Sequence, residues 1–143
     1  MTELLAVVAI MGILASLAAP SFSEMIKSQR IKSMATDLNA SLALARSEAV
    51  KRNKNVTLSP ATVGSWDSGW QIADPDNVGS NIDVHSAFAG LTVTGPDSVI
   101  YRSSGRIQGG VAPAFNISAA GTTAQRCVSV DLSGRPYLTA AAC

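Results

Sequence analysis

The chain has 143 residues, a hydrophobic content of 47% and a formal net charge of +1 at pH 7. This length fits one domain with a short additional segment, and a net charge near zero excludes a global field that would recruit nucleic acid. The charges are nevertheless unevenly placed. Seven of the eleven Lys and Arg lie between Glu24 and Lys54 with three acids, whereas four Arg and six Asp lie from Asn55 onward.

An uncharged apolar run occupies the N-terminus from Leu4 to Ala19, LLAVVAIMGILASLAA. As an α-helix it would rise roughly 24 Å, slightly less than the ~30 Å hydrocarbon core of a bilayer. The alternatives are a membrane anchor, a secretory signal peptide and a buried core helix. Glu3 precedes the run where a signal peptide has Lys or Arg, and a carboxylate at the edge of hydrocarbon is a candidate functional group. We therefore expect residues 1–20 to form a hydrophobic membrane helix.

Residues 21–54 predict an amphipathic continuation of the same helix. Its apolar positions follow a 4-3-4-3 spacing that forms one seam on a helix: Ile31, Ala35, Leu38, Leu42, Ala45 and Ala49. Glu48 and Arg52 stand four residues apart in the order that favours an ion pair. The helix is expected to end near Asn53.

Two features mark the junction between the apolar and amphipathic halves. Pro20 lacks an N–H and is expected to kink the helix rather than end it. The cations Lys27, Arg30 and Lys32 follow the apolar run. Because the rest of the chain follows on the same side, we expect them to meet lipid headgroups or neighbouring subunits rather than to set topology.

From residue 55 to residue 143 the apolar pattern changes to a period of two. The predicted strands are Val56–Ser59, Gly69–Ala73, Leu91–Thr94, Val99–Arg102, Ala114–Ser118, Cys127–Leu132 and Pro136–Thr139. Turn-forming residues separate them, including Pro60, Gly64, Asp74-Pro75-Asp76-Asn77, Gly95-Pro96, Ser104-Gly105 and Ser133-Gly134. This pattern predicts an antiparallel sheet or a small sandwich with a final hairpin that turns at Ser133-Gly134. The fold class is therefore α+β, with a long N-terminal helix packed on a β-rich head.

The only cysteines are Cys127 and Cys143. A metal site would need more ligands than two cysteines and the single histidine, His85. Lone buried thiols are one alternative. A disulfide is favoured because the anchor would place the rest of the chain outside the cytoplasm.

No pattern for a catalytic or metal site emerges from the sequence. His85 falls in a stretch that we expect to be a loop, and no Ser, Cys or acid stands in a nucleophile motif. Asp74, Asp76 and Asp83 lack the spacing of an EF-hand and are expected to lie in a solvated turn. We expect no enzyme activity, no cofactor and no bound metal.

The segment MTELLAVVAIMGILASLAAP resembles the N-terminus of type IV pilins and type II secretion pseudopilins. In that family a leader is removed by prepilin peptidase, and Glu3 and Pro20 match the spacing of its conserved acid and proline. Two residues precede Glu3 where the family has four, so we expect the chain to begin two residues inside the mature protein. The resemblance implies that Glu3 and Pro20 act in assembly, with other pilin or pseudopilin subunits as partners.

Later segments are similar to the GspH/FimT/FimU branch of minor pilins. They are ARSEAVKRN from Ala45, Gly69-Trp70 before an Asp-rich loop, a strand that runs into Gly105-Arg106, and Ser-Gly-Arg ending at Arg135. This branch packs a long helix on a β-rich domain. The resemblance implies a minor pilin that primes or assembles a type IV pilus and supports twitching motility, adhesion or DNA uptake; the alternative is a minor pseudopilin of type II secretion. It also implies a single pass through the bacterial inner membrane, a periplasmic head and a place in an extracellular filament.

A third function implied by the same branch is DNA binding for natural transformation. Members that resemble DNA receptors carry Gly-Arg-x-Arg in the last hairpin, but here Tyr137 replaces the second arginine. Arg135 is then the first candidate for a phosphate contact, with Arg126 and Arg106 as further candidates. Because affinity grows with the number of phosphates neutralised, this thin patch favours a structural role over nucleic-acid binding.

Overall fold

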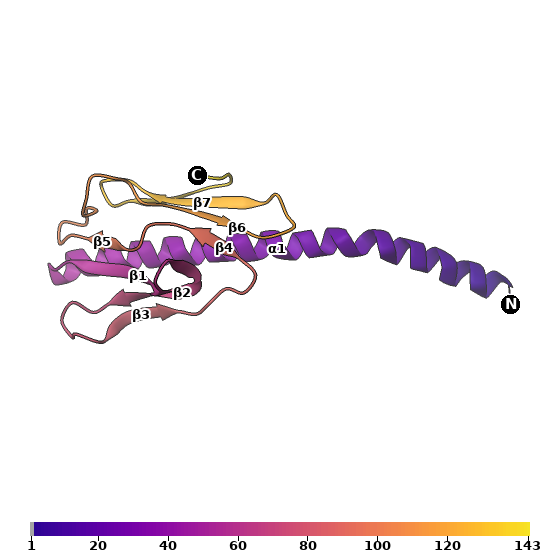
Figure 1. The fold of residues 1–143 in the computed structure, drawn as a ribbon, viewed down its shortest axis with the longest axis horizontal. Coiled ribbons are helices and arrows are strands. Elements are labelled where there is room, and N and C mark those ends of the chain that lie inside the picture. The colour runs from indigo at the N-terminus through magenta and orange to yellow at the C-terminus, as the bar shows by residue number, and fades with distance from the viewer. Residues whose placement is uncertain (1) are drawn as a thin grey trace.

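One long helix runs through the molecule and carries all the strands on its C-terminal half (Figure 1). The structure is a computed structural model that describes residues 2–143, apart from the side chains of residues 15–21. The helix, α1, spans Thr2–Arg52, a length of roughly 76 Å. Its N-terminal half projects from the head and ends at the far side of the molecule from the strands (Figure 1).

The C-terminal half of α1 buries the predicted apolar seam. All six seam residues are at most 1% exposed, and Met34 joins them in the core: Ile31, Met34, Ala35, Leu38, Leu42, Ala45 and Ala49. Burial of each large aliphatic side chain contributes about 1.5–3 kcal/mol relative to exposure. The predicted seam is therefore confirmed, and it forms one wall of the hydrophobic core.

The end of α1 follows from the backbone conformation of Asn53. Its φ of 52° is left-handed, a conformation that asparagine tolerates better than most residues. Its N–H donates to the carbonyl of Val50 at 3.3 Å, and the N–H of Lys54 donates to Ala49 at 3.2 Å. These two bonds form a Schellman motif, so the predicted helix end is confirmed to within one residue.

Two four-stranded sheets make up the head, and all their paired strands are antiparallel. The first sheet has the order β3 (Asn81–His85), β2 (Ser65–Ala73), β1 (Val56–Thr62) and β5 (Val99–Tyr101). The second has the order β4 (Thr92–Thr94), β6 (Ala114–Ser118), β7 (Gln125–Val130) and β8 (Pro136–Thr139). The expected α+β fold with a long N-terminal helix on antiparallel β structure is confirmed.

Several predicted strand positions were wrong. The edge strand β3 was not predicted, because Asn81 and Asp83 are poor strand formers. Pro60 was assigned to a turn, yet it lies within β1 opposite Trp70, next to a register irregularity, a position where a strand accommodates proline. The strand β2 also begins at Ser65, four residues before its predicted start at Gly69.

The two sheets meet at an aromatic pair. The rings of Trp66 in β2 and Phe115 in β6 lie edge to face with centroids 4.8 Å apart. The indole Nε1 of Trp66 donates to the carbonyl of Pro96 at 2.7 Å. A Cβ at Gly95 would lie 2.5 Å from the Phe115 ring, so glycine is required for this close approach.

The Gly69-Trp70 pair places a buried tryptophan between α1 and β3. A Cβ at Gly69 would overlap the carbonyl oxygen of His85, and the φ of Gly69 is 93°. Trp70 is fully buried and donates from Nε1 to Ser41 Oγ of α1 at 2.9 Å. The expectation of a loop at His85 was wrong, since His85 lies in β3 and stacks on Trp70 with centroids 4.3 Å apart.

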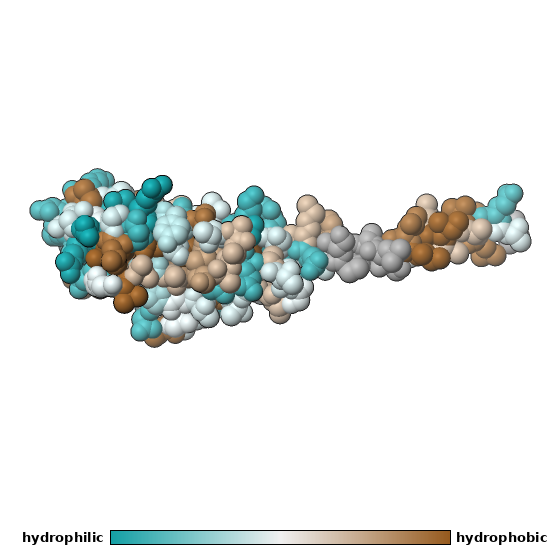
Figure 2. All heavy atoms as spheres, turned by 90° about the horizontal axis from the view of Figure 1, so that it is seen from above, coloured by the Kyte–Doolittle hydropathy of each residue, from teal (hydrophilic) through white to brown (hydrophobic). Residues whose placement is uncertain are grey.

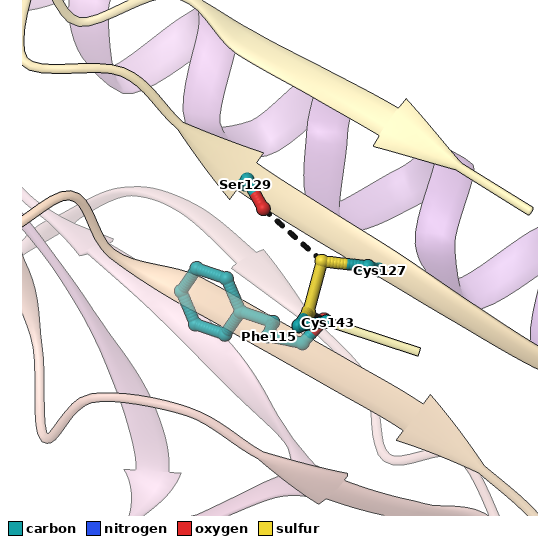
Figure 3. The surroundings of a disulfide bond; sticks show 4 residues. All are labelled: Phe115, Cys127, Ser129 and Cys143. Atoms are coloured by element: carbon teal, nitrogen blue, oxygen red, sulfur yellow. Dashed lines mark hydrogen bonds between the residues drawn. A yellow bond between two sulfur atoms is a disulfide. The ribbon is translucent and has the colours of Figure 1, made fainter. Parts of the chain in front are cut away.

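A disulfide joins Cys127 in β7 to Cys143, with Cα atoms 5.0 Å apart. Figure 3 shows Cys143 lying against Phe115 of β6, with Cys127 and Ser129 on the neighbouring strand. The Cys143 sulfur is 3.2 Å from the carbonyl oxygen of Phe115. The predicted disulfide is confirmed, and it attaches the segment after β8 to the middle of the second sheet.

Replacing Cys127 with Ser should lower the free energy of unfolding by about 3 kcal/mol, because a closed loop of this size restricts the unfolded chain. The cysteines are 16 residues apart. Cys143→Ser and the double variant should cost the same amount, since each removes the same link. Urea unfolding of the full chain in detergent, followed by fluorescence of the buried Trp66 and Trp70, would measure this. Two titratable thiols in the denatured, unreduced protein would contradict the pairing.

Candidate functional site

The N-terminal half of α1 presents apolar side chains without cover from the head. Exposed large residues there are Leu4, Leu5, Val7, Val8, Ile10, Met11, Ile13, Leu14, Phe22, Met25 and Ile26. Figure 2 shows a brown, hydrophobic band near the N-terminal end of the projecting helix. Glu3 lies in the first helical turn, where a carboxylate complements the helix dipole. The head therefore leaves this apolar helix surface open to another apolar environment.

Two parts of the predicted anchor lie outside the described side chains. They are residues 15–19 at the end of the apolar run and the neighbouring Pro20, so the role in assembly predicted for Pro20 falls outside the side chains that the structure describes. Searched over its described residues, the chain contains no helix with the length and apolar character needed to cross a bilayer.

Arg46 of α1 binds two glycine-containing turns of the head. Its Nε donates to the carbonyl of Gly105 at 3.1 Å, and one terminal nitrogen donates to the carbonyl of Ser133 at 3.2 Å. The turns touch each other so closely that a Cβ at Gly134 would overlap the Gly105 carbonyl oxygen. Arg46 therefore connects α1 to two turns that are 59 and 87 residues away in sequence. These bonds fix the position of both turns relative to the helix.

The two turns carry exposed arginines toward solvent. Arg102 and Arg106 flank the first turn and Arg135 leaves the second, and all three are exposed. Asp131 accepts bonds from the Ser133 hydroxyl and the Arg135 N–H, which together lower its pKa below the ordinary range. The structure thus brings predicted residues Arg106 and Arg135 together on adjoining turns and adds Arg102.

Arg126 does not belong to this cluster. It lies at the start of β7 and lines a groove with Lys32, Ala35 and Thr36 of α1, whereas Arg106 and Arg135 follow turns held by Arg46. Lys32 and Arg46 are 14 residues apart on α1, which corresponds to roughly 21 Å. Arg126 therefore lies away from the turns that carry Arg106 and Arg135.

A cavity of about 470 Å³ opens between the last turns of α1 and the start of β8. It is lined by Ala43, Arg46, Ser47, Val50, Lys51 and Pro136. Among the residues that the structure describes, the buried phenol oxygen of Tyr101 has no hydrogen-bond partner, and burial raises the pKa of this tyrosine above its ordinary range. Tyr137, in the position of the missing second arginine, is 46% exposed.

The Asp-rich loop after β2 pairs with the end of α1. Arg52 contacts Glu48 at 2.7 Å, Asp74 at 2.8 Å and Asp76 at 2.8 Å, and Lys54 contacts Asp76 at 2.6 Å. The expected pair between Glu48 and Arg52 is confirmed. The expectation that Asp74 and Asp76 lie in a merely solvated turn was wrong, because both carboxylates neutralise cations of α1 and its C-cap.

These ion pairs, together with hydrogen bonds within the loop, lower the pKa of Glu48, Asp74 and Asp76. The side chain of Arg52 is the main cause for Glu48, and Lys54 followed by Arg52 is the cause for Asp76. For Asp74 the leading cause is the backbone N–H of Asp76, followed by the Asn77 amide. The same ion pairs raise the pKa of Arg52. The network therefore holds the loop that follows β2 against the end of α1.

An apolar helix projecting from a β-rich head defines a structural subunit of the pilin and pseudopilin class. The family described as Type II transport protein GspH matches residues 34–134, which is more than half of the chain, so the protein belongs to the GspH family. The resemblance to the minor pilin branch is thereby confirmed. Members of this family are membrane-associated, filament-forming structural proteins that associate with other pilin or pseudopilin subunits.

Solved structures with the same fold come from both systems. Two crystal forms of the type IV minor pilin FimU of Pseudomonas aeruginosa share 24% and 25% identity, with TM-scores of 0.69 and 0.67. The matches cover 78% and 76% of this chain and 89% and 91% of FimU. The minor pseudopilin EpsH of the Type 2 Secretion System of Vibrio cholerae shares 16% identity and a TM-score of 0.59, covering 78% of this chain and 97% of EpsH. No curated protein matches the sequence significantly.

Acid should weaken the head through the network around Arg52. The carboxylates have depressed pKa values in the folded state, so their stabilisation is complete above roughly pH 4, the range of the unfolded values, and is lost as pH falls through the lowered values. Urea midpoints at pH 7 and pH 3 should show a smaller acid-induced fall in Arg52→Gln than in the parent. Arg102→Gln, an exposed change of equal charge, should behave like the parent, and equal falls in all three proteins would contradict this account.

Proposed function

We propose that the protein is a non-enzymatic minor pilin of a type IV pilus. The observation that carries this proposal is the apolar surface of α1 over residues 4–14 and 22–26, which the head leaves uncovered. Such a surface is stable only in hydrocarbon or against other apolar helices. A subunit that waits in the inner membrane and then joins a helical bundle provides both environments in turn.

The anchor and the head then occupy different compartments. The N-terminal half of α1 makes a single pass through the inner membrane, and the head lies in the periplasm, where its disulfide is stable. Prepilin peptidase produces the mature N-terminus before assembly. Pro20 interrupts one backbone hydrogen bond of the helix and eases its adjustment between lipid and filament.

Glu3 supplies the electrostatic control of assembly. A carboxylate at the edge of hydrocarbon is costly without a cationic partner, and the N-terminal amine of a neighbouring subunit is such a partner. Pairing of these charges favours the filament over the membrane and fixes the relative height of two helices. The alternative is the same role in a type II secretion pseudopilus, as the minor pseudopilin EpsH illustrates.

A second candidate function, DNA binding, is favoured by one observation. Arg102, Arg106 and Arg135 lie exposed on adjoining turns that Arg46 holds together. Three cations at one end of the head would neutralise several backbone phosphates of a duplex. The six aspartates from Asn55 onward oppose this function at longer range.

Glu3→Gln should abolish incorporation of the subunit into surface filaments while leaving its level in the membrane unchanged. The reason is that the amide retains the size of the side chain but removes the charge that pairs with a neighbouring amine. Immunoblots of sheared filaments and of membranes would measure both quantities. Glu24→Gln, which removes an exposed acid outside the apolar run, is the matched control and should incorporate normally. Normal amounts of Glu3→Gln in filaments would refute the assembly role.

If the second function operates, affinity for duplex DNA should fall steeply with salt. Arg135→Ala and Arg106→Ala should each reduce the slope of log affinity against log salt by about one. Gel-shift titrations of the detergent-solubilised chain at several salt concentrations would measure the slopes. Arg126→Ala should have a smaller effect because it lies away from the cluster. Equal effects of all three substitutions, or weak binding without salt dependence, would exclude a site on these turns.

A further inference from the structure

One side of the head, which we call the basic flank, carries β7 and β8 together with Lys32, Arg46, Arg126 and Arg135. Figure 1 shows β7 on one side of α1 and β3 on the other. Arg46 of α1 binds the turn before β8, and Arg126 at the start of β7 lines a groove with Lys32. Arg135 is exposed just before β8. Asp131 is an acid on the same turn, so cations exceed acids on this flank.

The opposite side, which we call the acidic flank, carries β2 and β3 together with Asp37, Asp67 and Asp83. Asp67 lies in β2 and Asp83 in β3, and Asp37 of α1 lies 3.6 Å from His85 of β3. The loop of residues 74–80 joins the two strands, and its acids pair with the end of α1. Within the described part of the chain, Asp67 and Asp83 form no ion pair, so this flank keeps a net negative charge.

The basic flank contains a hollow that is open to a partner. It is the cavity of about 470 Å³ between α1 and the start of β8, and Ala43, Val50 and Pro136 give it apolar walls. The charged side chains in its lining, Arg46 and Lys51, are both cations. A small apolar side chain can fill such a hollow and remove these walls from water, while neighbouring acids complement the cations. The hollow therefore suits an apolar residue that is flanked by acids.

The loop of residues 74–80 on the acidic flank has this chemistry. Val78 in this loop is 105% exposed and follows Asp76 by two residues. Backbone bonds of 3.0 Å join Asp74 to Ser80 and Ser80 to Asn77, and ion pairs hold the loop to the end of α1. Because the loop is already ordered, docking it into a partner costs little conformational entropy.

From these complementary flanks we propose that the hollow beside β8 receives Val78 from the loop of residues 74–80 of a second copy of the chain. The proposal rests on the membrane-anchored state proposed above. Because every chain is anchored through its N-terminus, neighbouring heads stand in the same orientation. The basic flank of one head then meets the acidic flank of the next without inversion of either head, and the opposite charges orient the contact.

The contact is heterologous, since two different surfaces of the chain meet. The hollow lies beside residues 43–51 of α1, whereas the loop is bound at Arg52 and Lys54. Successive heads are therefore displaced along the helix axis, and repetition of such a contact winds a helix instead of closing a ring. The heads thus acquire a lateral order of their own, in addition to the association of the apolar helices.

The test is disulfide cross-linking between two variants of the full chain in phosphatidylcholine vesicles. One variant carries Ala43→Cys and the other Val78→Cys, and each has one free thiol because Cys127 and Cys143 are already paired. Oxidation with copper phenanthroline should join them at least about tenfold more than Ala43→Cys with Val63→Cys, since burial of a small apolar side chain favours the pair by about this factor. Val63 is the matched control because it is 91% exposed but lies in the turn between β1 and β2, at the other end of the first sheet.

Salt should weaken the contact, because the two flanks attract through charge. Raising the ionic strength from about 0.01 M to about 1 M shortens the Debye length from roughly 30 Å to roughly 3 Å, and cross-linking of Ala43→Cys with Val78→Cys should fall at least about fivefold. Equal cross-linking of the test and control pairs, no cross-linking, or cross-linking only to a different pilin subunit would overturn the proposal. Carbonate extraction of the same vesicles tests the anchor separately, because release of the chain would refute the membrane-anchored state whether or not the cross-link forms.

Discussion

Burial of one stripe of α1 is the constraint on which the rest of the structure depends. The same helix has to be apolar on every side in its first half and on only one side in its second half. Ile31, Leu38 and Leu42 face both sheets through a single seam, and without that seam neither small sheet would have a sufficient core. The head is therefore built around a helix that it shares with a second environment.

Polar residues at the borders of the seam determine how the strands are placed on it. Arg46 holds two turns of the head, Ser41 accepts a bond from Trp70, and Arg52 holds the loop after β2. Each of these partners lies more than twenty residues away in sequence. The stretch of α1 from Ser41 to Arg52 thus combines part of the core with three polar residues that bind the Ser-Gly-Arg, Gly-Trp and Asp-Pro-Asp segments of the head.

Local signals were sufficient to predict α1, whereas the disulfide was predicted from the presence of only two cysteines and from the compartment that the anchor implies. The 4-3-4-3 spacing and Asn53 define the buried face and the end of the helix, because both depend on residues near one another in sequence. The strand β3 could not be predicted from local signals. Its register places His85 opposite Trp70 and leaves Val84 exposed, so at the end of the strand the polar residue packs on the core and the apolar residue faces solvent, which no local rule predicts. The cluster of Arg102, Arg106 and Arg135 also depends on contacts across the fold, since the turns at Gly105 and Gly134 are far apart in sequence and are both bonded by Arg46.

The shared helix also determines how the protein carries mechanical load. In a filament under tension, force enters a subunit along α1 and leaves through the head. The seam from Ile31 to Ala49 runs parallel to that force, so its buried contacts resist in shear and all bear load together, whereas a load that peeled the helix away would break them one after another. Forced unfolding is governed by the barrier to the first rupture. A helix that extends through the whole head, and not a short one at its edge, therefore gives a small β domain high resistance to pulling along one axis.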